Sequence, residues 1–87
     1  MEKPSQGALV LVNWLDIQTD SGWKETTEDV KPAACKSVGF VTLVKPGYIV
    51  LAGMLGLEPD TKHTESNVRQ CIPWGCVTSW NLLRRAR

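Results

Sequence analysis

Hydrophobic positions in this chain gather in short runs that lack a helical repeat. The first run, residues 8–17 (ALVLVNWLDI), is rich in β-branched and aromatic side chains, and apolar residues occupy both of its alternating faces. Such a run is typical of a strand that is covered on both sides. We therefore predict a first β-strand over these residues.

The clearest pattern predicts a hairpin. Two further β-rich runs, residues 35–44 and 49–55, flank the segment 45–48 (KPGY). Proline suits the second position of a type II turn, and glycine suits the third position, where φ must be positive. Gly39 interrupts the first of these runs, which predicts a strong bend or a close approach of another backbone segment.

Polar segments separate the remaining elements. Residues 18–34 (QTDSGWKETTEDVKPAA) are turn-prone and predict at most a short helical turn around residues 26–31, which Pro32 would end. Residues 56–67 (GLEPDTKHTESN) predict a loop. After it, residues 68–73 and 76–83 predict two more strands that meet at a tight tryptophan–glycine corner.

Five short strands without a crossover helix predict an all-β protein. A long strand that bends at a glycine is one way in which a small antiparallel sheet curls into a barrel. We therefore predict one strongly bent, five-stranded barrel domain over residues 8–83. Residues 1–7 form a predicted flexible N-terminus, and residues 84–87 form a basic tail.

Composition agrees with one small folded domain. The 87 residues are 43% hydrophobic and 22% charged, and the formal net charge is +1. A charge this small excludes bulk attraction as the source of nucleic-acid binding. No apolar run approaches the roughly 18 residues that span a bilayer, and the segment 1–7 (MEKPSQG) lacks the apolar core of a signal peptide. These features predict a cytoplasmic protein without membrane association.

The order of the segments resembles the Sm-like fold. The similarity covers residues 35–83 and depends on VGFVTLVKPGYIVLAG followed by CIPWGCVTSW. In the Sm-like fold a bent strand with an internal glycine precedes a hairpin, and an isoleucine-arginine-glycine corner joins the last two strands. Sm-like RNA binders read bases with an aspartate and an asparagine of the hairpin and with the corner arginine. Here Lys45, Pro46, Tyr48 and Trp74 occupy those regions, so the resemblance implies the fold without the uridine-reading residues.

A second resemblance concerns other stretches. The segments NWLDIQTDSGWKE, CKSVGF and IPWG are similar to small uncharacterised proteins encoded by tailed bacteriophages. This resemblance implies a protein that works in the cytoplasm of a bacterial host. Sequestration of a host nucleotide immune signal is one function that it suggests, and direct inhibition of a host protein is another.

The three cysteines do not predict a disulfide scaffold. Cys71 and Cys76 are separated by four residues, and Cys35 and His63 could complete a zinc site. We favour buried free thiols, with no metal and no cofactor. No Ser/His/Asp set or phosphate-cradling glycine loop is present in the sequence, so we expect no enzymatic activity.

Four tryptophans are many for a chain of this length. Trp14 and Trp80 lie in apolar strands and predict contacts with the core or with another subunit. For Trp23 and Trp74, packing under a loop and contact with a ligand are both open. Asp16 either accepts hydrogen bonds from the loop that follows it or binds a ribose or base group.

Together these residues predict a non-enzymatic binding protein for a nucleotide-type ligand. Aromatic rings would stack on the base, and cations would contact the phosphate. The surplus of apolar strand faces, for example at Val38, Phe40, Ile49 and Leu51, predicts a homo-oligomer. An RNA-binding ring and a host-protein inhibitor are the alternative functions. The predicted ligand-binding residues are Trp74, Trp23, Tyr48, Asp16, Lys45, Arg69 and Lys36.

Overall fold

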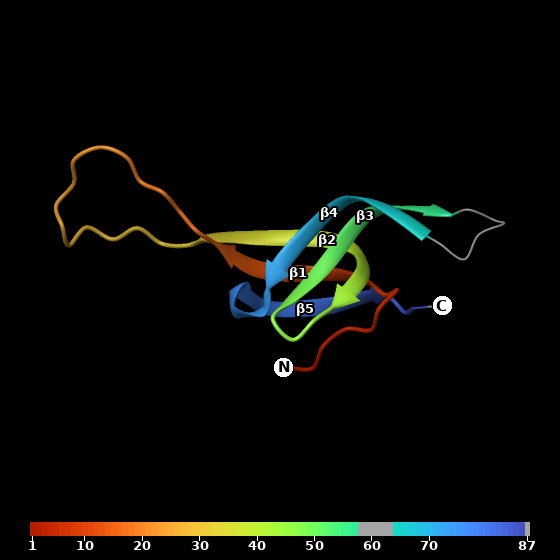
Figure 1. Ribbon diagram of the computed structural model, residues 1–87. Helices are drawn as coiled ribbons and strands as arrows, with labels where there is room; N and C mark the ends of the chain where they lie inside the picture. Colours follow the sequence, from red (N-terminus) through yellow and green to blue (C-terminus); the bar gives the residue numbers. More distant parts are fainter. Residues whose placement is uncertain (58–63, 87) are drawn as a thin grey trace.

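The part of the chain that the structure describes forms a single curved antiparallel sheet with one short 3-10 helix (Figure 1). The computed structural model describes residues 1–57 and 64–86. The strands are β1 (Leu9–Asp16), β2 (Ala33–Val44), β3 (Tyr48–Leu57), β4 (Thr64–Pro73) and β5 (Val77–Arg84), and η1 (Trp74–Cys76) joins β4 to β5. The prediction of an all-β protein with five antiparallel strands is confirmed.

The order of the strands in the sheet is β4-β3-β2-β1-β5. The hydrogen-bonded pairing leaves β4 and β5 as the two edges, so the sheet is not closed and the predicted barrel is not confirmed. The sheet nevertheless coils strongly, and β3 and β4 cross over the strands β1 and β5 (Figure 1). This coiling lets residues from all five strands contribute to one hydrophobic core.

Alternate residues of the strands form this core. Val10 and Val12 of β1 are buried, whereas Leu9, Leu11 and Asn13 are half-buried. Ile49 and Leu51 of β3 are also buried in the same core. The prediction that these two side chains are available for a subunit contact is therefore wrong, because the coiled sheet buries them within the chain.

Gly39 produces the predicted close approach inside β2. A Cβ atom at this position would lie 3.0 Å from the Ala52 carbonyl oxygen and 3.0 Å from the Leu51 Cβ atom. The pairing of β2 with β3 shifts register between Val41 and Leu43, a short distance along the same strand. The missing side chain thus lets β2 bend tightly over β3, as Figure 1 shows.

The β2–β3 hairpin forms where it was predicted, but its turn type differs. The Lys45 backbone N–H donates to the Tyr48 carbonyl oxygen over 2.9 Å. Gly47 does not adopt a positive φ, so the prediction of a type II turn is wrong. Contacts from outside the turn explain the difference, because the Gly47 carbonyl oxygen accepts the backbone N–H of Trp74 (3.1 Å).

The polar segments also differ from the prediction. β4 begins at Thr64, so part of the predicted loop 56–67 is strand, while residues 58–63, including His63, lie outside the described residues. Residues 26–31 form no helix and contain only a turn, in which the Glu28 N–H donates to the Glu25 carbonyl oxygen. An isolated helical turn without a packed face is not stable in water, and every side chain of this segment is exposed.

Residues 17–32 form an extended loop between β1 and β2 that we call the arm. It projects beyond the end of the sheet (Figure 1), and all of its residues are exposed. Its projection agrees with the elongated molecule, which measures 60 × 26 × 21 Å along its principal axes. The arm is therefore a long segment that the rest of the chain leaves uncovered.

The segment 1–7 lies along the sheet. The Gly7 backbone N–H donates to the Val41 carbonyl oxygen (2.7 Å), and the Gln6 side chain donates to the Thr42 carbonyl oxygen (2.8 Å). These bonds extend the N-terminal segment along the bent part of β2. Within the described ranges, no helix has both the length and the hydropathy that a membrane span requires.

Candidate ligand site

Two tryptophans stabilise the sheet. The Trp14 indole donates to the Ser37 hydroxyl over 2.9 Å, and the Trp80 indole donates to the Glu2 carbonyl oxygen over 2.8 Å. Both rings pack against the hydrophobic core. The prediction that these residues contact the core is confirmed, and the bond to Glu2 also holds the N-terminal segment against β5.

Trp74 connects η1 to the β2–β3 hairpin. Its indole N–H donates to the Lys45 carbonyl oxygen over 2.7 Å, and its ring packs against the core. The Lys3 ammonium group lies 5.1 Å from the ring centroid, within the range of a cation–π interaction. The sequence left packing and ligand contact open for Trp74, and these contacts correspond to packing.

Trp23 differs from the other three tryptophans. It lies in the arm with a relative exposure of 102%, so its ring lacks cover from its own chain. None of the hydrogen bonds found within residues 1–57 and 64–86 involves its indole. The arm therefore presents a large apolar ring to solvent, away from the other predicted ligand-binding residues.

Lys36 belongs to a polar network across three strands. Its ammonium group donates to the Asn13 side-chain oxygen over 2.6 Å, and the Asn13 amide donates to the Ser79 hydroxyl over 3.0 Å. These residues link β2, β1 and β5 on an exposed face. The Lys36 cation is thus bound to a neighbouring strand, and the structure does not place it with Trp74.

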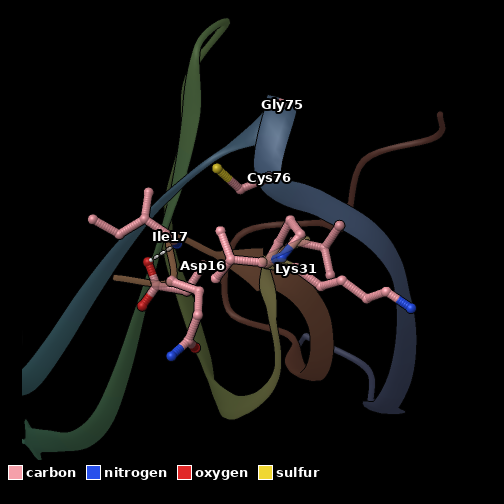
Figure 2. A pocket seen from close by; sticks show the side chains of 9 residues that line it. Asp16, Ile17, Lys31, Gly75 and Cys76 are labelled. Carbon is pink, nitrogen blue, oxygen red and sulfur yellow. Dashed lines mark hydrogen bonds between the residues drawn. The ribbon is translucent and has the colours of Figure 1, made fainter. Parts of the chain in front are cut away.

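Asp16 bonds to the start of the arm. One of its carboxylate oxygens accepts the Ile17 backbone N–H over 2.8 Å, the local bond that was predicted for it (Figure 2). The carboxylate lines a hollow of about 420 Å³ at the base of the arm, together with Gly75 and Cys76. In Figure 2 the Lys31 side chain points away from this carboxylate, so the hollow has no cluster of cations for an anionic ligand.

Three of the predicted residues lie at the hairpin end of the sheet. Tyr48 is opposite Pro73 in the β3–β4 register, which places it beside Trp74, and the Lys45 carbonyl oxygen accepts the Trp74 indole. Arg69 pairs with Ala52, further along the same two strands. The structure therefore brings Tyr48, Lys45 and Trp74 together. Asp16 shares its hollow with Gly75 and Cys76, which follow Trp74 in η1, whereas Lys36 bonds to Asn13 and Trp23 lies in the arm.

The register creates a row of residues that sequence reasoning did not identify. From one edge of the sheet to the other, successive pairs align Arg84 of β5, Leu9 of β1, Phe40 of β2, Ala52 of β3 and Arg69 of β4. Directly paired residues project to the same face of a sheet. The row therefore has an aromatic side chain at its centre and a guanidinium group on each edge strand.

A hollow lies over part of this row, at Leu9, Phe40 and Arg84, and we call it the arginine hollow. Its volume is about 650 Å³, and its lining consists of Gly7, Leu9, Phe40, Gly53, Met54, Leu55, Arg84 and Arg85. An adjoining hollow of about 510 Å³ shares Gly7 and Leu55 with it and adds Arg69. The first hollow therefore has Arg84 and Arg85 in its lining, and the adjoining hollow has Arg69.

The sequence signal for this site was weak. Arg84 and Arg85 were assigned to a basic C-terminal tail, and Phe40 was assigned to a subunit contact. The pairing of Arg84 with Leu9 joins the two ends of the described chain, and no local pattern reveals such a contact. Only the composition of the tail, with several arginines close together, hinted at an anion site.

The cysteines provide no metal centre in the described part of the chain. All three are free thiols, and Cys71 is exposed, so the prediction that it is buried is wrong. Among residues 1–57 and 64–86, no group of three or more His, Cys, Asp or Glu side chains could hold a metal ion. The fourth ligand considered from the sequence, His63, lies outside these residues.

Comparisons with known proteins do not identify this chain. No family model matches it, and neither a curated protein nor a solved structure is similar enough to count as a match. The functional argument therefore depends on the residues and the geometry alone.

Proposed function

We propose that this chain is a non-enzymatic binding protein that holds a nucleotide-type ligand in the arginine hollow. The observation that supports the proposal is the row across the sheet, in which Phe40 lies between Arg84 and Arg69 on one face. The ligand class is the one expected from the sequence, but the residues that bind it are different.

The chemistry of the hollow suits such a ligand. Guanidinium groups form paired, charge-assisted hydrogen bonds to phosphate oxygens, and Arg84 and Arg85 are both exposed at the rim. Phe40 is half-buried beside Met54 and Leu9, which provides an apolar surface for a base. Stacking on an aromatic side chain accepts any base, because every base has a flat π face.

The size and position of the adjoining hollow favour a ligand with more than one phosphate. Volumes of about 650 and 510 Å³ fall within the range of small-molecule sites in proteins, roughly 300 to 1,000 Å³. A ligand that spans both hollows would place one phosphate near Arg84 and another near Arg69. A dinucleotide or a nucleoside polyphosphate has this arrangement. For a phage protein, such binding would sequester a nucleotide signal of the host. The strongly coiled, five-stranded sheet would then be an Sm-like barrel whose edge strands β4 and β5 are not paired with each other.

Calorimetric titration with ATP, ADP, a cyclic dinucleotide and adenosine tests the proposal. We expect the phosphorylated ligands to bind and adenosine to bind at least about tenfold more weakly, because it lacks the charge-assisted bonds. The double variant Arg84→Ala/Arg85→Ala should lose about tenfold or more in affinity for ATP. The double variant Lys36→Ala/Lys45→Ala removes the same charge from positions outside both the arm and the hollows and should bind like the original chain.

Two outcomes would overturn the assignment. One is the absence of binding by every nucleotide, and the other is equal affinity in the arginine variant and its lysine control. A short single-stranded RNA in the same titration addresses the alternative of an RNA-binding ring. Preference for RNA with a steep salt dependence would replace the small ligand by RNA.

A further inference from the structure

The arm has the composition of a binding segment rather than of a simple connection. It exposes three apolar side chains, Ile17 (86%), Trp23 (102%) and Val30 (50%). Removal of such side chains from water is favourable, and aromatic residues are enriched where proteins contact one another. The structure leaves them uncovered within one chain, so they are available for contact with another molecule.

The charges of the arm complement those of the arginine hollow. The arm has four acidic residues and two basic residues, which gives it a net negative charge; the acidic residues are Asp20, Glu25, Glu28 and Asp29. The hollow has an apolar floor around Phe40 and Met54, with Arg84 and Arg85 at its rim. An apolar, acidic segment therefore has an apolar, basic counterpart on the same molecule.

In the structure, the arm lies away from the hollow of its own chain (Figure 1). Leu9, which lines the hollow, begins β1, and Asp16 ends the strand where the arm starts. An eight-residue strand extends over about 25 Å, and the arm continues away from the sheet (Figure 1). The two complementary surfaces are thus at opposite ends of the molecule.

We propose that the arm of one copy occupies the arginine hollow of a second copy. Trp23 of the arm lies against the floor formed by Phe40 and Met54, and the arm carboxylates face Arg84 and Arg85. Opposite charges across such an interface speed association and fix its orientation.

Two copies related by a two-fold axis satisfy both arms at once. When the copies lie antiparallel, each arm reaches the end of its neighbour that contains the hollow. Such an isologous contact closes as a dimer, whereas a parallel arrangement would continue into a filament. The opposite placement of arm and hollow therefore predicts a closed dimer. This interface differs from the strand-face contact expected from the sequence, because Ile49 and Leu51 are buried within the chain.

The dimer does not require the proposed nucleotide function, but the two would compete. Arm carboxylates and ligand phosphates both need Arg84 and Arg85, so a bound nucleotide should displace the arm. A protein that dimerises without binding any nucleotide would retain this inference and lose the proposed function. A protein that binds nucleotides as a monomer at all concentrations would retain the proposed function and lose this inference.

Sedimentation equilibrium from micromolar to millimolar concentration tests the dimer. We expect the mass to rise from that of one chain, 9.6 kDa, to twice this value. Trp23→Ala should weaken dimerisation about tenfold or more, as expected for a buried aromatic anchor at an interface. Val38→Ala changes another exposed apolar residue outside the arm and the hollow and should leave dimerisation unchanged.

A charge exchange identifies the two surfaces. The variants Arg84→Glu/Arg85→Glu and Glu25→Lys/Glu28→Lys should each be monomeric alone at concentrations where the original chain is dimeric. The chain that combines all four changes should dimerise again, because the attraction is restored with its signs reversed. The inference is overturned if the original chain is a monomer at every concentration. It is also overturned if the dimer is weakened neither by Trp23→Ala nor by the charge variants.

Discussion

The sheet and the arm use the same residue type for different purposes. In the sheet, the indole N–H groups of Trp14, Trp74 and Trp80 each donate to a defined oxygen, and their rings pack against the core. In the arm, Trp23 is fully exposed. The difference indicates that three tryptophans stabilise the chain, whereas the fourth is available to another molecule.

The two regions also differ in how their backbones are held. In the sheet, every strand is paired with at least one neighbour, and side chains on both faces of β3 are buried. In the arm, residues 17–32 leave the sheet and return to it at Ala33 of β2. Stability is therefore concentrated in the sheet, and substitutions in the arm should change binding more than folding.

The largest expected contrast in stability is between two tryptophans. Trp14→Ala should reduce the free energy of unfolding by about 3 kcal/mol, because it removes a large half-buried ring that packs against the core and the bond to Ser37. Trp23→Ala should change it by less than about 0.5 kcal/mol, as expected at an exposed position. Chemical denaturation at submicromolar concentration, where dimerisation contributes little, measures both values. Equal losses in the two variants would contradict the division between sheet and arm.

Two glycines sharpen the account of the sheet itself. Gly39→Ala should lower the free energy of unfolding by about 2 kcal/mol, because the new Cβ meets Ala52 and Leu51 at 3.0 Å. Gly47→Ala is the matched control, since no atom lies within 4 Å of its Cβ position and its φ is not positive. The control should be neutral or more stable by about 0.5 kcal/mol. A stable Gly39→Ala variant would refute the tight bend of β2 over β3.

The smallest expected effect is at the corner between β4 and β5. Trp74→Phe keeps an aromatic ring against the core but removes the indole bond to the Lys45 carbonyl oxygen. We expect a loss of about 1 kcal/mol in the free energy of unfolding, the usual value of one hydrogen bond. Thermal denaturation compares this variant with Tyr48→Phe, which retains that bond and should differ little from the original chain. An unchanged midpoint for Trp74→Phe would argue against its role in holding the hairpin.

Much of the fold could be predicted because the signals for it are local. The β-rich runs predicted the strands, the segment around Pro46 and Gly47 predicted the hairpin, and Gly39 predicted the bend. The turn type was not predictable in the same way, because the Gly47 peptide bonds to Trp74 from a distant part of the chain. The predicted helical turn at 26–31 failed for lack of any packing partner.

The candidate site was less predictable than the fold. Its residues were chosen by type, and the sequence contains no information on which strand lies beside which. Once β5 pairs with β1, Arg84 lies in line with Leu9 and Phe40. The Trp74 indole, in contrast, bonds to the Lys45 carbonyl oxygen of the hairpin. The hydrophobic pattern of the sequence could not show that Ile49 and Leu51 belong to the internal core, since both faces of that run are apolar.

The pairing of β1 with β5 also affects how the chain acquires its structure. β1 is synthesised first, but one of its two neighbours, β5, leaves the ribosome after all the other strands. Until then a row of unpaired backbone groups on β1 is open to pairing with other chains. Because this final pairing joins distant parts of the sequence, it should be slow, and refolding yield should fall as the protein concentration rises.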